Sequence, residues 1–149
     1  MTTRLWSVLI LGILISSLVA ACAGSAAQPV AGLNMVPESQ LPTQIKSAPA
    51  NVQEAYRFAV ANPELMKEIP CFCGCVAGGH TSNYACYVNE AGSPAGILQY
   101  DDHALGCGIC VDITQDVMKM VQEGKAVDEM RTVVNQRYGS FGPSTDGAK

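Results

Sequence analysis

Three cysteines alternate with single residues in the stretch from Ile69 to His80, which reads IPCFCGCVAGGH. Cys71, Cys73 and Cys75 are therefore close enough in sequence to act together. Thiolates serve as disulfide partners, as redox nucleophiles and as ligands for soft metal ions. The spacing thus predicts a disulfide framework, a metal site or a redox centre, and the compartment in which the chain works helps to decide between them.

Cysteine and histidine donors gather between residues 71 and 110. They are Cys71, Cys73, Cys75, His80, Cys86, His103, Cys107 and Cys110. Four such donors complete a tetrahedral zinc site, so this set suits two sites or a multinuclear copper(I)–thiolate cluster. We expect all of them to be metal ligands, with copper(I) or zinc as the ion. A fully extended C-x-C-x-C run cannot surround one ion, so the chain has to curl, and Gly74 permits a curl.

Disulfide bonds are the first alternative for the same cysteines. An even number of cysteines in an exported domain is typical of a disulfide framework, and six cysteines allow fifteen pairings. Residues two apart on an extended chain lie about 6.6 Å apart, near the upper limit for a disulfide. The three alternating cysteines would then need Cys86, Cys107 and Cys110 as partners. A disulfide-stapled interaction module is therefore an alternative to the metal site.

A C-x-x-C motif, Cys107 to Cys110, supports a second alternative. It precedes a predicted helix that starts near Asp112, and the amides at a helix N-terminus stabilise thiolates. A thiol–disulfide oxidoreductase that uses Cys107 and Cys110 would fit, although no long strand precedes the motif as in thioredoxin-like folds. The sequence shows no hydrolase elbow and no phosphate-binding loop. We assign no catalytic residue and favour a role other than catalysis.

The N-terminal segment indicates the compartment. Arg4 precedes an apolar run over residues 5–15, and small residues lead to Cys22, as in an export signal. The run is shorter than the roughly 20 residues of a membrane span. A cysteine after two alanines is typical of a bacterial lipobox, so we expect a signal peptide over residues 1–21 and a lipid on Cys22. The protein would then be exported and anchored to the cell membrane on the extracytoplasmic side.

The expected partners follow from the anchor, the thiols and the charge. The lipid on Cys22 would hold the protein to the membrane, and a thiolate site suits exchange with a metal donor or acceptor protein. The formal net charge of the chain is −4. A negative chain disfavours nucleic acid as a partner.

Composition divides the exported chain into three parts. Alanine, proline, serine and glutamine dominate up to about residue 50, so residues 22–50 are predicted to be a flexible tether. A cysteine-rich folded domain is expected over residues 51–141. The remaining residues, 142–149, are predicted to be a disordered tail.

Apolar periodicity predicts a mainly α fold, a small helical domain that flanks a glycine- and cysteine-rich loop stapled by metal or disulfides. Helical spacing predicts a helix over residues 51–61 and a short helical turn between Pro63 and Pro70. Helices over residues 111–124 and 126–139 are joined by a very short link, which predicts a C-terminal αα-hairpin.

Two brief apolar runs interrupt the glycine-rich loop. They cover residues 85–88 and 97–100, and the turn-forming residues between them favour a short β-hairpin.

The sequence PCFCGC at residues 70–75 resembles the signature of a bacterial lipoprotein family named for its PCYCGC motif, with Phe72 in place of the tyrosine. The resemblance extends through GHTSNYAC (79–86), HALGCGICVDI (103–113) and EMRTVVNQRYG (129–139). It implies an exported, lipid-anchored domain and no established activity. The change at Phe72 leaves thiol ligation intact and argues against a role for the hydroxyl group.

Overall fold

The computed structural model describes residues 32–92, 94 and 97–148, and this part of the chain is mainly helical, as predicted. Its α-helices are α2 (Thr43–Lys46), α3 (Ala50–Ala61), α4 (Pro63–Glu68), α5 (His103–Gly106), α6 (Gly108–Gln122) and α7 (Val127–Tyr138). Short 3-10 turns lie at η2 (Glu38–Gln40), η3 (Cys75–Gly78), η4 (Tyr84–Cys86) and η5 (Thr145–Ala148). The predicted αα-hairpin is formed by α6 and α7, which pack against each other.

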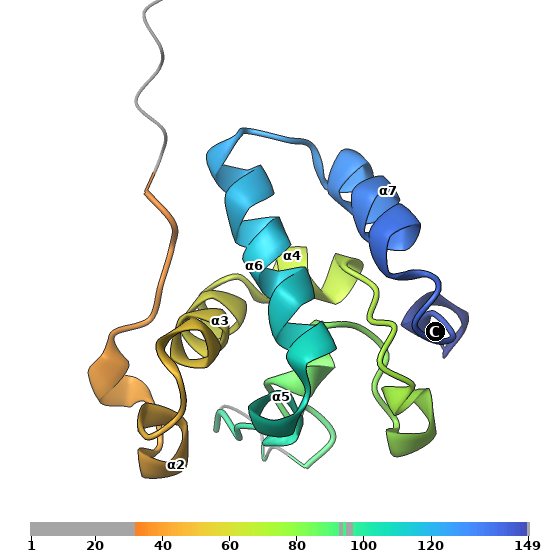
Figure 1. The fold of residues 1–149 in the computed structure, drawn as a ribbon. Coiled ribbons are helices and arrows are strands. Elements are labelled where there is room, and N and C mark those ends of the chain that lie inside the picture. The colour runs from red at the N-terminus through yellow and green to blue at the C-terminus, as the bar shows by residue number, and fades with distance from the viewer. Residues whose placement is uncertain (1–31, 93, 95–96, 149) are drawn as a thin grey trace, which may run out of the picture. The chain divides into compact units, whose positions relative to one another are not determined.

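Helix α6 is the central element of the domain. It packs against α3 and α7, and α5 lies at the end of α6 where the cysteines are (Figure 1). Ile113, Val117 and Met120 recur at helical spacing and are buried, which is why this segment forms a core helix. Met130 and Val134 of α7 are buried in the same core.

Helix α6 begins earlier than the sequence predicts. The predicted start was near Asp112, whereas the structure begins the helix at Gly108 with Cys107 as the N-cap residue. Cys107 is extended, with φ −118° and ψ 99°, as N-cap residues usually are. The C-x-x-C motif therefore forms the first turn of the helix rather than a loop before it.

The predicted β-hairpin brings its two segments together but forms no extended strands there. One antiparallel bridge joins Val88 and Tyr100. Next to it, the Asn89 N–H donates to the Gln99 carbonyl at 2.9 Å. The first segment winds instead into the 3-10 turn η4, which ends at Cys86.

Part of the predicted tether belongs to the folded domain. Leu41 and Ile45 are buried, and α2 packs against α3. The Arg57 side chain of α3 also donates to the Val36 carbonyl at 2.8 Å. Two apolar side chains four residues apart are enough to attach this proline-rich segment to the core. The boundary predicted at residue 51 is therefore wrong for residues 33–50, while the signal peptide and Cys22 lie outside the described residues.

The prediction of a disordered tail is also wrong for residues 142–148, which the structure describes. Thr145 is fully buried and makes two hydrogen bonds with Cys71. Its hydroxyl accepts from the Cys71 N–H at 2.9 Å, and its own N–H donates to the Cys71 carbonyl at 3.0 Å. A Cβ on Gly142 would lie 2.7 Å from the Phe72 carbonyl oxygen, so glycine allows this close approach. The tail therefore holds the cysteine motif in place.

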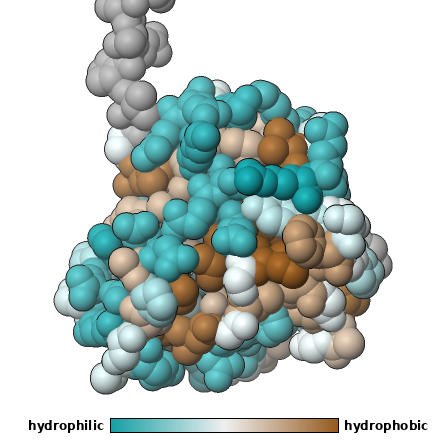
Figure 2. Space-filling view, viewed as in Figure 1, coloured by the Kyte–Doolittle hydropathy of each residue, from teal (hydrophilic) through white to brown (hydrophobic). Residues whose placement is uncertain are grey.

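The surface of the domain is mixed in character. Figure 2 shows hydrophobic patches on one face that are separated by hydrophilic side chains. Among the helices of the described chain, none has the length and apolar character to cross a membrane.

The hydrogen bonds of Thr145 give a first prediction. In Thr145→Val the side chain keeps its shape, but the buried Cys71 N–H loses its acceptor. We expect the free energy of unfolding to fall by about 1–3 kcal/mol, the cost of an unsatisfied buried donor. Urea unfolding followed by circular dichroism measures this change.

Thr132→Val provides the matched control, because the Thr132 hydroxyl is exposed and donates only to the Asp128 carbonyl of its own helix. Its free energy of unfolding should change by less than about 0.5 kcal/mol. Equal losses in the two variants would show that the tail does not stabilise the cysteine motif.

A candidate metal centre of cysteines and His103

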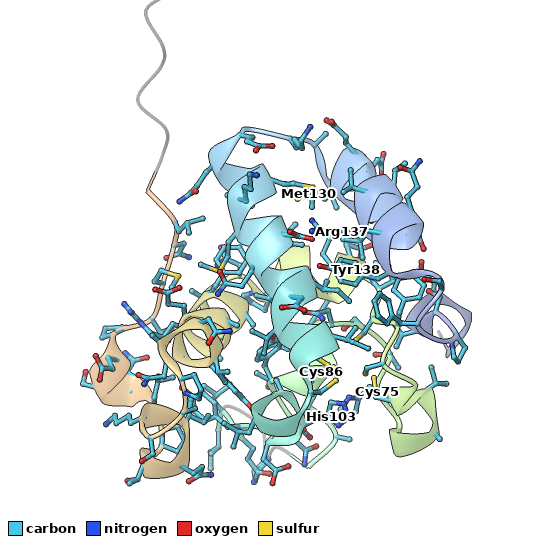
Figure 3. The ribbon with its side chains drawn as sticks, in the orientation of Figure 1. Cys75, Cys86, His103, Met130, Arg137 and Tyr138 are labelled. Carbon is cyan, nitrogen blue, oxygen red and sulfur yellow. The ribbon has the colours of Figure 1, made fainter. Side chains whose placement is uncertain are left out.

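Side chains from four separate segments meet at the end of α6 where that helix begins. These segments are the 71–75 stretch, the end of η4, the start of α5 and the first turn of α6. They supply Cys71, Cys73, Cys75, Cys86, His103, Cys107 and Cys110. Figure 3 shows Cys75, Cys86 and His103 directed toward the same region. The sequence-predicted donors therefore converge, with the exception of His80.

The sulfur atoms lie at the distances of a thiolate metal site. Cys71, Cys73 and Cys110 form a triangle whose Sγ–Sγ edges are 3.3, 3.6 and 3.5 Å. The Cys86 sulfur lies 3.8 Å from Cys71 and 3.9 Å from Cys75. Sulfurs bound to one tetrahedral zinc ion through bonds of about 2.3 Å lie roughly 3.8 Å apart. The spacing is thus close to that of ligands around an ion.

The donors fall into three overlapping groups of four. Within each group, all ligand atoms lie within 4.8 Å of one another. The groups are Cys71, Cys73, Cys86 and Cys110; Cys73, His103, Cys107 and Cys110; and Cys73, Cys75, Cys86 and His103. Cys73 belongs to all three groups, which makes its sulfur the centre of the cluster.

Gly74 lets the motif curl, as the sequence predicts. It adopts the left-handed conformation with φ +79° and directly precedes η3, which starts at Cys75. This conformation is unfavourable for residues with a Cβ. The turn at Gly74 is what allows Cys73 and Cys75 to serve the same cluster.

A buried polar network fixes the first turn of α6. The Tyr87 hydroxyl donates to the Cys110 carbonyl at 2.9 Å, and the Asn83 amide donates to the same carbonyl at 3.3 Å. The Thr114 hydroxyl lies 2.7 Å from Tyr87 Oη and donates to Asn83 Oδ1 at 2.7 Å. All three side chains are fully buried. Sequence analysis missed them; the one signal was Thr114, four residues after Cys110 and therefore on the same face of the helix.

The two histidines lie side by side, but only His103 approaches a sulfur. Its Nε2 lies 3.4 Å from Cys73 Sγ. The His80 ring packs edge-on against the His103 ring with centroids 4.9 Å apart. His80 Nε2 lies 3.8 Å from one carboxylate oxygen of Asp101. The other carboxylate oxygen of Asp101 accepts a hydrogen bond from the backbone N–H of His103 at 2.8 Å. His80 thus flanks the cluster and belongs to none of its groups of four.

Hydrogen bonds between the thiols shift their pKa values in opposite directions. The hydrogen bond with Cys110 lowers the pKa of the Cys71 thiol to about 4. The bonds from Cys110 and Cys71 hold the pKa of Cys73 well below its usual range. The pKa of Cys110 is raised, chiefly by its hydrogen bond with Cys71, so it remains a donor. The hydrogen bonds from Cys71 and Cys110 thus favour the thiolate form at Cys73, which is the form that binds metals.

The cluster has a buried side and an open edge. Its buried donors are Cys71, Cys75, Cys86 and Cys110, whereas Cys73, His103 and Cys107 are partly exposed. Exposed glycines, Gly74, Gly106 and Gly108, flank these partly exposed donors in sequence, and a Cβ on any of them would meet nothing within 4 Å. All six cysteines of the described chain are free thiols.

Comparison with known proteins identifies the sequence motif rather than an activity. A family model described as "Protein of unknown function with PCYCGC motif" matches residues 33–148. Searches of curated proteins and of solved structures find no match. The match begins at residue 33, so it includes the N-terminal segment that packs against α3.

The conformation of Gly74 gives a second prediction. Gly74→Ala places a Cβ in open space but in a left-handed backbone, which costs about 1–2 kcal/mol. We expect a loss of stability of this size and weaker metal binding, measured by urea unfolding and by competition with a chromophoric zinc chelator.

Gly78→Ala is the matched control, because its Cβ also meets nothing within 4 Å and its φ is not positive. This variant should behave as the unchanged protein does. If Gly74→Ala is equally harmless, the turn is not a constraint on the cluster.

Proposed function

We propose that this protein, which belongs to the family of proteins of unknown function with a PCYCGC motif, binds a soft metal ion. The ion is copper(I) or zinc, and its ligands come from the seven cysteine and histidine donors of the cluster. The role is capture, buffering or delivery of that metal outside the cytoplasm. The observation that carries the proposal is that these donors form three overlapping groups of four, within each of which all ligand atoms lie within 4.8 Å of one another.

The pattern of sulfur contacts supports a metal site over a disulfide framework. Cys71 contacts the sulfurs of Cys73, Cys86 and Cys110 at 3.3–3.8 Å. A framework would arrange sulfurs in separate pairs, because each sulfur forms one disulfide bond. Several sulfurs around a common point are instead the arrangement that a thiophilic ion requires.

The open edge supports exchange of the ion with a partner. Transfer between proteins proceeds by replacement of ligands one at a time, so at least one donor has to be reachable. Cys107 and His103 are partly exposed, and the neighbouring Gly106 and Gly108 are exposed residues without a side chain. A metal donor or acceptor protein is therefore the proposed partner.

The proposed location rests on the N-terminal sequence. Cys22 follows a predicted export signal and two alanines, so the protein would be lipidated there and held to the outer side of the cell membrane. A chain with a formal net charge of −4 has little attraction for nucleic acid.

The C-x-x-C motif supports a second candidate function, thiol–disulfide exchange. Cys107 is the partly exposed N-cap residue of α6 and Cys110 is buried one turn later. In that reaction the Cys107 thiolate attacks a substrate disulfide and releases one substrate thiol, and Cys110 then attacks the mixed disulfide, so that the Cys107–Cys110 disulfide forms and the second substrate thiol leaves. The contacts of Cys110 with Cys71 and Cys73 favour the metal site, because they tie the resolving sulfur into the larger cluster.

Native mass spectrometry tests the proposed function. The full chain, purified in detergent without added reductant or chelator, should carry copper or zinc and six intact thiols besides Cys22. Free metal at 100 times its Kd should raise the free energy of unfolding by about 2.7 kcal/mol, and removal of the metal should reverse this gain. Cys73→Ser should bind less metal, because Cys73 belongs to every group of donors.

Two results would contradict metal binding. A metal-free chain that is lighter by about six mass units would contain three disulfides and support the stapled module. Disulfide reductase activity that requires Cys107 and Cys110 but tolerates Cys73→Ser would support the oxidoreductase.

Metabolic labelling with a radioactive fatty acid tests the anchor. The unchanged chain should incorporate the label and sediment with membranes, whereas Cys22→Ala should remain unlabelled. Labelling that persists in Cys22→Ala would place the lipid elsewhere.

A further inference from the structure

We infer that the cluster is a dinuclear centre for divalent thiophilic ions such as zinc, with Cys73 and Cys110 as bridging thiolates. The inference rests on the proposed function and adds the number of ions, the ligands of each and the order of their exchange. One ion, the inner ion, would have Cys71 and Cys86 as its terminal ligands. The other, the outer ion, would have His103 and Cys107.

The number of donors calls for more than one ion. A tetrahedral ion uses four ligands, whereas seven donors converge here. The three groups of donors are not independent, because any two of them have two residues in common. Two ions can occupy two groups at once only if the shared residues bridge them.

Chemistry limits which groups can be occupied together. A thiolate sulfur has several lone pairs and can bridge two ions, but a neutral imidazole offers a single nitrogen lone pair. The group that contains Cys107 and the group that contains Cys75 share His103, so an ion cannot occupy both at once. One ion therefore occupies the all-cysteine group of Cys71, Cys73, Cys86 and Cys110. The other occupies either the Cys107 group, with Cys73 and Cys110 as bridges, or the Cys75 group, with Cys73 and Cys86 as bridges.

The sulfur distances favour the pair bridged by Cys73 and Cys110. Their Sγ atoms lie 3.5 Å apart. With metal–sulfur bonds of about 2.3 Å, two ions on opposite sides of this sulfur pair would be about 3 Å apart. Helix α6 supplies Cys107 and Cys110 from its first turn, so one rigid element presents a bridging and a terminal ligand to the outer ion.

Charge favours divalent ions in this centre. Five thiolates carry five negative charges, and two divalent ions offset four of them. Two copper(I) ions would leave three negative charges in a largely buried site, which is costly. The donors Cys71, Cys86 and Cys110 are buried, so the charge balance matters here more than at the surface.

Burial makes the two ions unequal. The terminal ligands of the inner ion, Cys71 and Cys86, are fully buried. The terminal ligands of the outer ion, His103 and Cys107, are partly exposed at the open edge. The outer ion is therefore the one that exchanges with a partner or chelator, and the inner ion keeps the bridging sulfurs in place.

The test loads the reduced full chain in detergent with zinc and counts bound ions by native mass spectrometry. We expect two zinc ions, a zinc–zinc distance of about 3 Å by X-ray absorption, and two phases of removal by a chromophoric chelator. Cys107→Ser and His103→Ala should each bind one ion and lose the fast phase. Cys75→Ser should still bind two.

His80→Ala is the matched control, because His80 packs against His103 but belongs to no group of donors. It should bind two ions with both phases. Circular dichroism checks that each variant is folded, and the zinc–zinc distance is measured on the unchanged chain, so it does not depend on any variant.

The outcomes separate the two proposals. A chain that binds no zinc or copper overturns the proposed function and this inference together. One or three ions in the unchanged chain, or two without a short zinc–zinc distance, overturn the dinuclear centre alone. Loss of the second ion in Cys75→Ser but not in Cys107→Ser would assign the bridge to Cys86 and overturn the bridging role of Cys110.

Discussion

The approach of the 71–75 stretch to the first turn of α6 is the contact around which the domain is organised. It brings Cys71 and Cys73 within 3.6 Å of Cys110, across almost forty residues of sequence. Sulfur atoms at these distances are polar and partly anionic, so apolar packing alone does not hold them together. The stretch is fixed from one side by the hydrogen bonds of Thr145 and from the other by the helix that carries Cys110. The packing of α6 against α3 and α7 supports this contact, since any tilt of α6 would move Cys110 away.

Periodicity predicted the longer helices α3, α6 and α7 because each buries apolar residues at regular spacing, whereas the four-residue helices α2 and α5 are too short to show a period. Ile113, Val117 and Met120 are buried on one face of α6, as their spacing requires. The start of α6 was predicted too late because glycine has a low helix propensity, so Gly108 gave no signal that the helix begins there. The role of Thr145 had no local signal, since its partner Cys71 is 74 residues away and a single buried hydroxyl creates no pattern.

The donor set was more predictable than its geometry. Residue type and spacing identified all seven converging donors, because thiols and imidazoles are rare enough to stand out in a glycine-rich loop. The same reasoning added His80, which the structure places beside Asp101 and the His103 ring instead of a sulfur. Sequence could not show that the groups share Cys73, nor that Asn83, Tyr87 and Thr114 hold the Cys110 carbonyl, because these relations arise only when distant segments meet.

The position of the cluster at the edge of the core would reconcile two demands on a thiolate site at the proposed extracytoplasmic location. Free thiols outside the cytoplasm are exposed to oxidants, and their susceptibility follows thiolate character and accessibility. Burial of Cys71 and Cys86 protects the sulfurs that define the site. Complete burial would, however, prevent an incoming ligand from replacing a resident one. Partial exposure of Cys107 and His103 would provide that access. Without these two residues, the group of Cys71, Cys73, Cys86 and Cys110 would still offer four sulfurs to an ion. The arrangement would thus suit the proposed role of a protein that holds a metal and passes it to a partner.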